Sequence, residues 1–190
     1  MSHLNRPNDA IALTWIAVGA AIVVLAVIAA APADQTGGFT IPAGYRDWPL
    51  ISVAAVGSPL SDIRAKLGND IAIKAFRDGT IPYPDGTIIA RLAWKQVPSE
   101  ENNAAFRQEA LAKGLSPDAI QKLLNSSFVA GPATNVQFMV KDSTKYASTG
   151  GWGYFQFTNG KLDSAPAATT CFACHAPIKA RDFVFTRYAP

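Results

Sequence analysis

The residues of this chain best suited to chemistry stand close together near its C-terminal end, in the segment "TTCFACHAPIKARDF". This segment places Cys171, Cys174 and His175 in the order Cys-x-x-Cys-His. The chain has no other cysteine, and its only other histidine is His3. Two thiols and an imidazole at this spacing can form a disulfide, bind a metal, act as a redox pair or attach a haem group.

Each of these four uses makes a different demand on the rest of the sequence. A disulfide is the default for two cysteines in an exported chain. A zinc site needs two further ligands, and a thioredoxin-like pair needs a preceding strand and a following helix. Haem attachment needs only the motif, because the two thiols form thioethers and the adjacent histidine becomes an axial ligand of the iron. We therefore predict one covalently attached haem c, held by Cys171 and Cys174, with His175 as the axial ligand.

The other axial position of the iron decides the function. Met139 is the only methionine after Met1, and a His/Met pair is typical of electron-transfer cytochromes. Met139 lies inside the apolar run "NVQFMVK", however, where a methionine is ordinarily core, and His3 lies in the leader. We favour a five-coordinate iron that is open to small ligands. A low-spin electron-transfer cytochrome with Met139 as sixth ligand is the alternative.

The N-terminal segment, residues 1–33, is predicted to be a membrane anchor or a signal peptide. Residues 10–31 contain no charge over 22 residues, and a helix of that length reaches about 33 Å, enough to cross a bilayer core. Small residues at 29–34, "AAAPAD", offer a cleavage site, but the run is longer than a usual signal sequence. We favour the uncleaved anchor. In either case the rest of the chain is predicted to lie in the periplasm, anchored to the inner membrane or secreted after cleavage.

The charge of the chain argues against a nucleic-acid partner. The formal net charge is +3, and removal of residues 1–33 deletes only Arg6 and Asp9 and leaves it unchanged. No dense cluster of lysine and arginine occurs.

Residues 34–190 are predicted to form one domain of the α+β class, with a mostly antiparallel sheet. Apolar, β-branched and aromatic runs separated by Gly-containing turns indicate the strands. These runs are Leu50–Val56, Thr87–Trp94, Asn135–Lys141, Trp152–Thr158 and Asp182–Tyr188. A helical hairpin is predicted at about 99–126, with Ser99 and Ser116 as N-caps, and a short helix at Asn69–Phe76.

Several motifs in a fixed order resemble the cytochrome P460 family, which includes the cytochrome c′-beta proteins. They are "IPAGYRDW" (41–48), "PDGTIIARLAW" (84–94), "VKDSTKYA" (140–147), "GGWGYFQF" (150–157) and "CFACHAPIKARDFVFTRYAP" (171–190). The resemblance implies an antiparallel β domain, usually dimeric, with one c-type haem, His175 as proximal ligand and an open distal side. Members with the P460 chromophore oxidise hydroxylamine, and c′-beta relatives bind nitric oxide or carbon monoxide. The helical hairpin departs from this pattern, and we interpret it as an insertion.

One residue separates the two types of relative. P460 enzymes have a lysine linked covalently to the haem, six positions after the Asp of the DGT turn, and counting from Asp85 reaches Arg91. A guanidinium stays protonated and is a poor nucleophile. Lys95 has the same strand parity but is displaced by about 13 Å. We therefore expect no haem–lysine link, and Arg91 is a candidate for the distal face or for a haem propionate. The alternative is a solvated or salt-bridged strand arginine.

The resemblance thus implies a protein that handles small nitrogen species, by nitric oxide binding or hydroxylamine oxidation. Its partners would be a small gaseous or nitrogenous ligand, a second copy of the chain and, for an enzyme, a cytochrome that accepts electrons. Further arginines that could pair with propionates are Arg181 and Arg187. Aromatic residues that could line the haem pocket are Phe76, Phe138, Trp152, Phe155 and Phe157.

Overall fold

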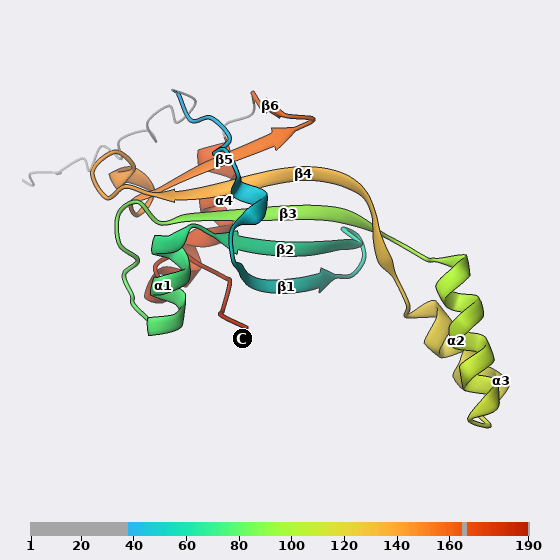
Figure 1. Cartoon of the computed structure of the whole chain (residues 1–190). Helices are drawn as coiled ribbons and strands as arrows, with labels where there is room; N and C mark the ends of the chain where they lie inside the picture. Colours follow the sequence, from blue (N-terminus) through green and yellow to red (C-terminus); the bar gives the residue numbers. More distant parts are fainter. Residues whose placement is uncertain (1–37, 165–166, 190) are drawn as a thin grey trace, which may run out of the picture.

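The computed structural model describes residues 38–164 and 167–189, and their fold is α+β as predicted (Figure 1). Among these residues, six antiparallel strands form one sheet in the order β1-β2-β3-β4-β5-β6, so each strand pairs with its neighbours in sequence. The predicted leader, residues 1–33, lies outside the described residues. Within the described ranges, no helix is long and apolar enough to cross a membrane.

The strands confirm part of the sequence prediction and correct the rest. They are β1 (Leu50–Val56), β2 (Asp62–Gly68), β3 (Ile88–Val97), β4 (Val129–Lys141), β5 (Trp152–Thr158) and β6 (Lys161–Leu162). The bounds of β1 and β5 are those predicted, whereas β3 and β4 extend further towards the hairpin.

Two errors concern the strands around the site. The strand predicted at Asp182–Tyr188 is wrong, because Asp182 and Phe183 have φ values of 48° and 64° and turn the chain instead of extending it. Strand β2 was not predicted, since its sequence "DIRAKLG" alternates charged with apolar residues and lacks an aromatic or β-branched run.

The helices are α1 (Asp70–Asp78), α2 (Glu100–Ala112), α3 (Pro117–Asn125) and α4 (Ala167–His175). The described part of the chain also contains the 3₁₀ helices η1 (Tyr45–Asp47), η2 (Ala147–Thr149) and η3 (Ala176–Arg181). The predicted caps are confirmed, because the side chains of Ser99 and Ser116 accept hydrogen bonds from backbone N–H groups in the first turns of α2 and α3. Helix α4 was not predicted.

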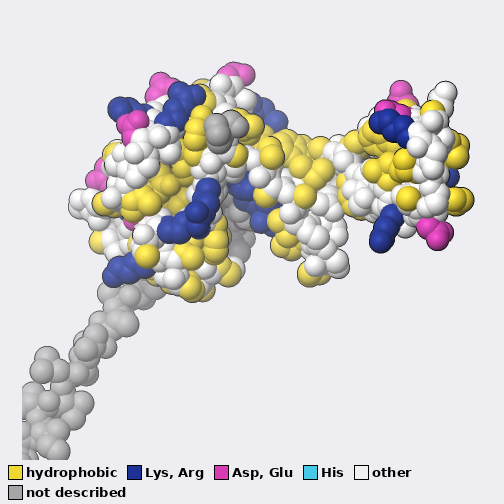
Figure 2. Space-filling model, turned by 90° about the horizontal axis from the view of Figure 1, so that it is seen from below, with side chains coloured by type: hydrophobic (Ala, Val, Ile, Leu, Met, Phe, Trp, Pro, Cys, Tyr) yellow, Lys and Arg dark blue, Asp and Glu magenta, His cyan; other side chains and the backbone are white. Residues whose placement is uncertain are grey.

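The predicted helical hairpin forms an arm, α2–α3, at the far ends of β3 and β4 (Figure 1). A small cluster of Ala110, Ile120 and Leu124 holds α2 and α3 together, separate from the core of the sheet. Figure 2 shows the arm projecting from the body with hydrophobic side chains on its surface. Its interpretation as an insertion stays a prediction.

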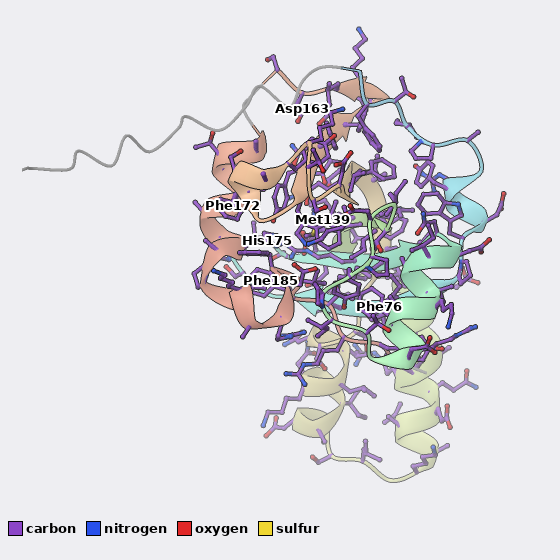
Figure 3. The ribbon with its side chains drawn as sticks, turned by 90° about the vertical axis from the view of Figure 1, so that its left-hand side faces the viewer. Phe76, Met139, Asp163, Phe172, His175 and Phe185 are labelled. Atoms are coloured by element: carbon purple, nitrogen blue, oxygen red, sulfur yellow. The ribbon has the colours of Figure 1, made fainter. Side chains whose placement is uncertain are left out.

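The two faces of the sheet are covered differently. Aromatic side chains Phe138, Phe155 and Phe157 pack on one face with Phe39, which precedes η1, and with Tyr45 of η1. Helix α4 and η3 lie on the other side of the sheet (Figure 3). The Cys-x-x-Cys-His motif therefore reaches the sheet on the face opposite to the one that Phe39 and Tyr45 cover.

Candidate haem site

Helix α4 gathers the three predicted haem residues in its last turn. Cys174 and His175 follow Cys171 by three and four positions, so each lies on the same side of the helix as Cys171. Both cysteines are free thiols, and the motif ends the helix instead of starting it, unlike a thioredoxin-like pair. No group of three or more His, Cys, Asp or Glu side chains that could hold a metal ion occurs in the described ranges. This arrangement keeps both thiols available for thioether bonds.

The imidazole of His175 is oriented by a backbone carbonyl. Its Nδ1 lies 2.6 Å from the carbonyl oxygen of Phe183, and since that oxygen can only accept, Nδ1 carries the proton. Nε2 is left unprotonated and available to a metal. Burial lowers the pKa of His175, although the Phe183 hydrogen bond opposes this shift. The neutral, metal-binding form is therefore favoured.

A cavity of about 900 Å³ extends from this motif to the sheet. Ile89, Met139 and Tyr154 contribute to its wall on the sheet side, and Val184 and Phe185 contribute from the C-terminal segment. Met139, His175 and Phe185 lie between α4 and the strands in Figure 3. The volume is within the range of small-molecule and cofactor pockets, which is about 300–1,000 Å³. Two free thiols, a neutral imidazole and apolar walls around such a space fit a covalently attached haem.

Charged and amide side chains of β2, β3 and β4 form a polar wall of the same cavity. The antiparallel register sets Lys66 beside Arg91 and Arg91 beside Gln137. Side chains opposite one another in neighbouring strands lie on the same face, so the three project together. Asp62, Arg64 and Asn135 also line the cavity. Among the residues lining this cavity, Asp62 has the one carboxylate.

Arg91 is held by three neighbours in this wall. Its Nη1 donates to Gln137 Oε1 at 2.8 Å and to Asn135 Oδ1 at 3.2 Å, and its Nη2 donates to Asp62 Oδ2 at 3.2 Å. Asp62 also accepts two hydrogen bonds from Arg64 Nε, at 2.9 and 3.1 Å, and one from its Nη2, at 3.0 Å. Within the described ranges, the buried Nε of Arg91 has no hydrogen-bond partner. Arg91 is thus salt-bridged, as in the predicted alternative, and it also lines the cavity. Its place at the distal face or at a haem propionate stays a prediction.

Burial perturbs the titrating groups around the cavity. It lowers the pKa values of Lys66 and Arg91, and for both residues the positive charge of Arg64 lowers them further. It raises the pKa of the Cys171 thiol, with a further increase from Cys174 and an opposing effect of Arg91. Arg91 and Cys171 line the same cavity, so the polar wall and the motif face a common space.

The remaining predicted site residues divide into those at the cavity and those outside it. Met139 and Lys95 line it. Phe138 and Phe155 also border it, but their side chains belong to the core on the opposite face of the sheet. Phe76, Trp152 and Phe157 belong to the buried core clusters. Arg181 and Arg187 are not among the lining residues, and Arg181 Nη2 donates instead to the backbone oxygens of Phe185 and Thr186.

Sequence reasoning missed the residues that β2 contributes, Asp62, Arg64 and Lys66. The alternation of charged residues in "DIRAKLG" was the available signal, because it places three charges on one face of a strand. It missed Tyr154 and Phe185 as well, whose rings lie 5.1 and 5.0 Å from the His175 ring.

Comparison with known protein families gives a match over most of the chain. The family model described as Cytochrome P460 matches residues 42–186, which include the cavity-lining strands, the arm and the Cys-x-x-Cys-His motif. Among curated proteins, none matches this chain.

Proposed function

Since this chain belongs to the cytochrome P460 family of c-type haem proteins, we propose that it binds and handles small nitrogen species at an open haem iron. In this proposal Cys171 and Cys174 form the two thioether bonds and His175 provides the axial ligand through Nε2. When bound there, a haem supplies an iron that changes oxidation state and a coordination position for a small ligand.

The observation that carries the proposal is the combination of an oriented His175 with a polar wall in one cavity. Arg91 is fixed by Asp62, Asn135 and Gln137, so its donors are ordered before any ligand enters. Ordered donors stabilise partial negative charge on a small bound molecule without a cost of reorganisation. Apolar residues such as Ile89 and Val184 limit the water in the rest of the cavity.

We place nitric oxide binding before hydroxylamine oxidation. Oxidation of hydroxylamine releases protons and electrons, so it needs a proton acceptor and a route for electrons to a partner cytochrome. Asp62, the one carboxylate among the cavity-lining residues, already accepts hydrogen bonds from Arg64 and Arg91. Both of its carboxylate oxygens are already engaged by guanidinium donors, so it offers no unengaged oxygen to a proton from the ligand.

A second function is kept because Met139 lines the same cavity. Its side chain packs against the core cluster that contains Tyr154 and Phe183. A thioether in this position could bind the iron and produce a low-spin electron-transfer cytochrome. Such a protein would leave no coordination position for a small ligand.

Optical spectra and peptide mass separate these functions. The full chain is produced with haem-attachment machinery, and ferric and ferrous spectra are recorded with and without nitric oxide. We expect high-spin spectra, a shift on addition of nitric oxide, and a haem peptide whose mass corresponds to two thioethers. The Met139→Leu variant should keep the wild-type spectrum.

Two results would contradict the proposal. Low-spin wild-type spectra that become high-spin in Met139→Leu would identify the electron-transfer cytochrome. A third covalent link, on Lys66 or Lys95, would refute the expectation that no lysine is joined to the haem and would favour the hydroxylamine-oxidising type.

The location and assembly of the protein are also proposals. We propose that residues 1–33 carry the haem domain across the inner membrane and hold it on the periplasmic side, and that the domain forms a homodimer, as the family resemblance implies. Membrane fractionation before and after deletion of residues 1–33 tests the first statement. Light scattering of the haem-loaded domain tests the second, and a monomer would contradict it.

A further inference from the structure

Behind His175 lies a turn whose backbone is unfavourable for the residues that form it. Asp182 and Phe183 have φ values of 48° and 64°, in the left-handed region that residues with a Cβ rarely adopt. Phe183 contributes the carbonyl that accepts the His175 hydrogen bond. Such a conformation persists where surrounding contacts determine it, so the contacts of this turn decide where that carbonyl points.

The first set of contacts is a buried ion pair. Lys141 Nζ lies 2.7 and 2.9 Å from the two carboxylate oxygens of Asp182, and each side chain is only 7% exposed. The Asp182 carboxylate also accepts the backbone N–H of Tyr83 at 2.8 Å. Lys141 Nζ donates further to the carbonyl oxygen of Gly150 at 3.2 Å. The pair therefore ties the turn to the end of β4 and to the loop before β5.

The second set fixes the backbone and the ring of the turn. The indole Nε1 of Trp152 donates to the Asp182 carbonyl at 2.8 Å. The Phe183 ring lies directly against Gly150, where an added Cβ would be 2.2 Å from the ring atom Cε2. The backbone N–H of Phe183 donates to Ile178 at 3.2 Å. The Asp182 side chain, the backbone of the turn and the Phe183 ring are therefore each restrained by separate contacts.

We propose that the Lys141–Asp182 ion pair positions the axial histidine, by fixing the Phe183 carbonyl against His175 Nδ1. This inference rests on the proposed function, in which His175 binds the iron. A strong hydrogen bond at Nδ1 orients the imidazole ring and makes Nε2 a better electron donor. Greater donation favours the ferric state, so the ion pair keeps the reduction potential low and the iron–histidine bond strong.

Three variants and one control test this role in the haem-loaded protein. Asp182→Asn removes one charge, Lys141→Met combined with Asp182→Asn removes both, and Trp152→Phe removes the indole donor. The control combines Lys74→Met with Asp78→Asn, an ion pair on α1 whose side chains are 77% and 48% exposed. The measurements are the reduction potential, the ferrous iron–histidine stretching frequency by resonance Raman spectroscopy, and thermal stability.

We expect a higher reduction potential and a lower iron–histidine frequency in all three variants, and wild-type values in the control. The double variant should regain thermal stability relative to Asp182→Asn, because it leaves no unpaired buried charge. Its potential should nevertheless stay raised, which a purely structural role of the pair would not produce.

Wild-type potentials and frequencies in variants of lowered stability would overturn the inference. Failure of the proposed function has a different signature. A low-spin wild-type spectrum would contradict the open iron site but not the role of the ion pair. The reduction potentials of the variants would still report whether the pair acts on His175.

Discussion

A single methyl group at Gly150 tests how tightly the support of His175 is packed. In Gly150→Ala the new Cβ would lie 2.2, 2.5 and 2.8 Å from three atoms of the Phe183 ring. No carbon atoms approach so closely, so the ring must move or the loop must open. Gly150 also has a φ of 69°, which an alanine adopts only with strain.

The two costs can be estimated separately. The left-handed backbone costs roughly 1–2 kcal/mol for a residue with a Cβ. Overpacking a closely packed core adds about 1–3 kcal/mol. Together they lower the free energy of unfolding by about 2–5 kcal/mol, and a loss of 3 kcal/mol corresponds to a fall in Tm of roughly 6–12 °C for a domain of this size.

Gly79→Ala is the matched control. Gly79 has a φ of 67° at the end of α1, and nothing lies within 4 Å of an added Cβ. It should therefore carry the backbone cost alone, about 1–2 kcal/mol. The difference between the two variants isolates the contact with the Phe183 ring.

Denaturant unfolding of the haem-loaded protein measures both variants, and optical spectra are recorded alongside. Gly150→Ala should lose more stability than Gly79→Ala and should also change the haem spectrum, because displacement of Phe183 moves the carbonyl bound to His175. Equal losses of stability with unchanged spectra would refute the argument that this loop supports the histidine.

Three further predictions concern the cavity, the arm and the dependence of stability on acidic pH. Arg91→Leu should speed nitric oxide release roughly 10-fold, from the loss of a charged donor, while the exposed control Arg187→Leu should release it at the wild-type rate in stopped-flow measurements. Replacement of residues 99–127 by a two-residue Asn-Gly turn should leave haem attachment and the spectrum intact, because the arm has its own small core; loss of haem attachment would show that the arm is needed for the fold. The Ser143 hydroxyl and backbone N–H hold the pKa of Asp85 below its ordinary value. A carboxyl group whose pKa is lower in the folded than in the unfolded state stabilises the fold at pH values above its unfolded pKa. That contribution is lost as the pH falls through the folded pKa. Ser143→Ala should thus be less stable than wild type at pH 7, with a difference in urea midpoint that shrinks below about pH 4; a constant difference would contradict this linkage.

The chemistry of the site could be predicted from the sequence because it depends on local spacing. Cys171, Cys174 and His175 lie within five consecutive positions, so their neighbourhood needs no long-range contact. The strands β1 and β5 and the arm could be predicted for a similar reason, since apolar runs, turns and serine caps are local signals. The order of the motifs was enough to indicate the family that the family model matches.

Local signals failed where a residue's surroundings come from distant parts of the chain. The charges of β2 resemble those of a solvated segment, yet pairing with β3 turns Asp62 and Lys66 towards a cavity. The run Asp182–Tyr188 has the composition of a strand, but contacts from Lys141 and Trp152 hold its start in a left-handed turn. In both cases tertiary contacts override the preference of the local sequence.

The sequence by itself determined which groups can hold a haem, because covalent attachment requires only two thiols and a histidine at fixed spacing. Only the tertiary structure decided what surrounds that haem. The polar wall around Arg91 depends on the register of three strands, and the direction of the His175 ring depends on a carbonyl eight residues further along the chain. The turn that contains this carbonyl is bound by Lys141 through its ion pair with Asp182, which lies 41 positions further along the chain. Strand register and buried ion pairs form only when distant segments pack around one core, so no single stretch of sequence specifies them.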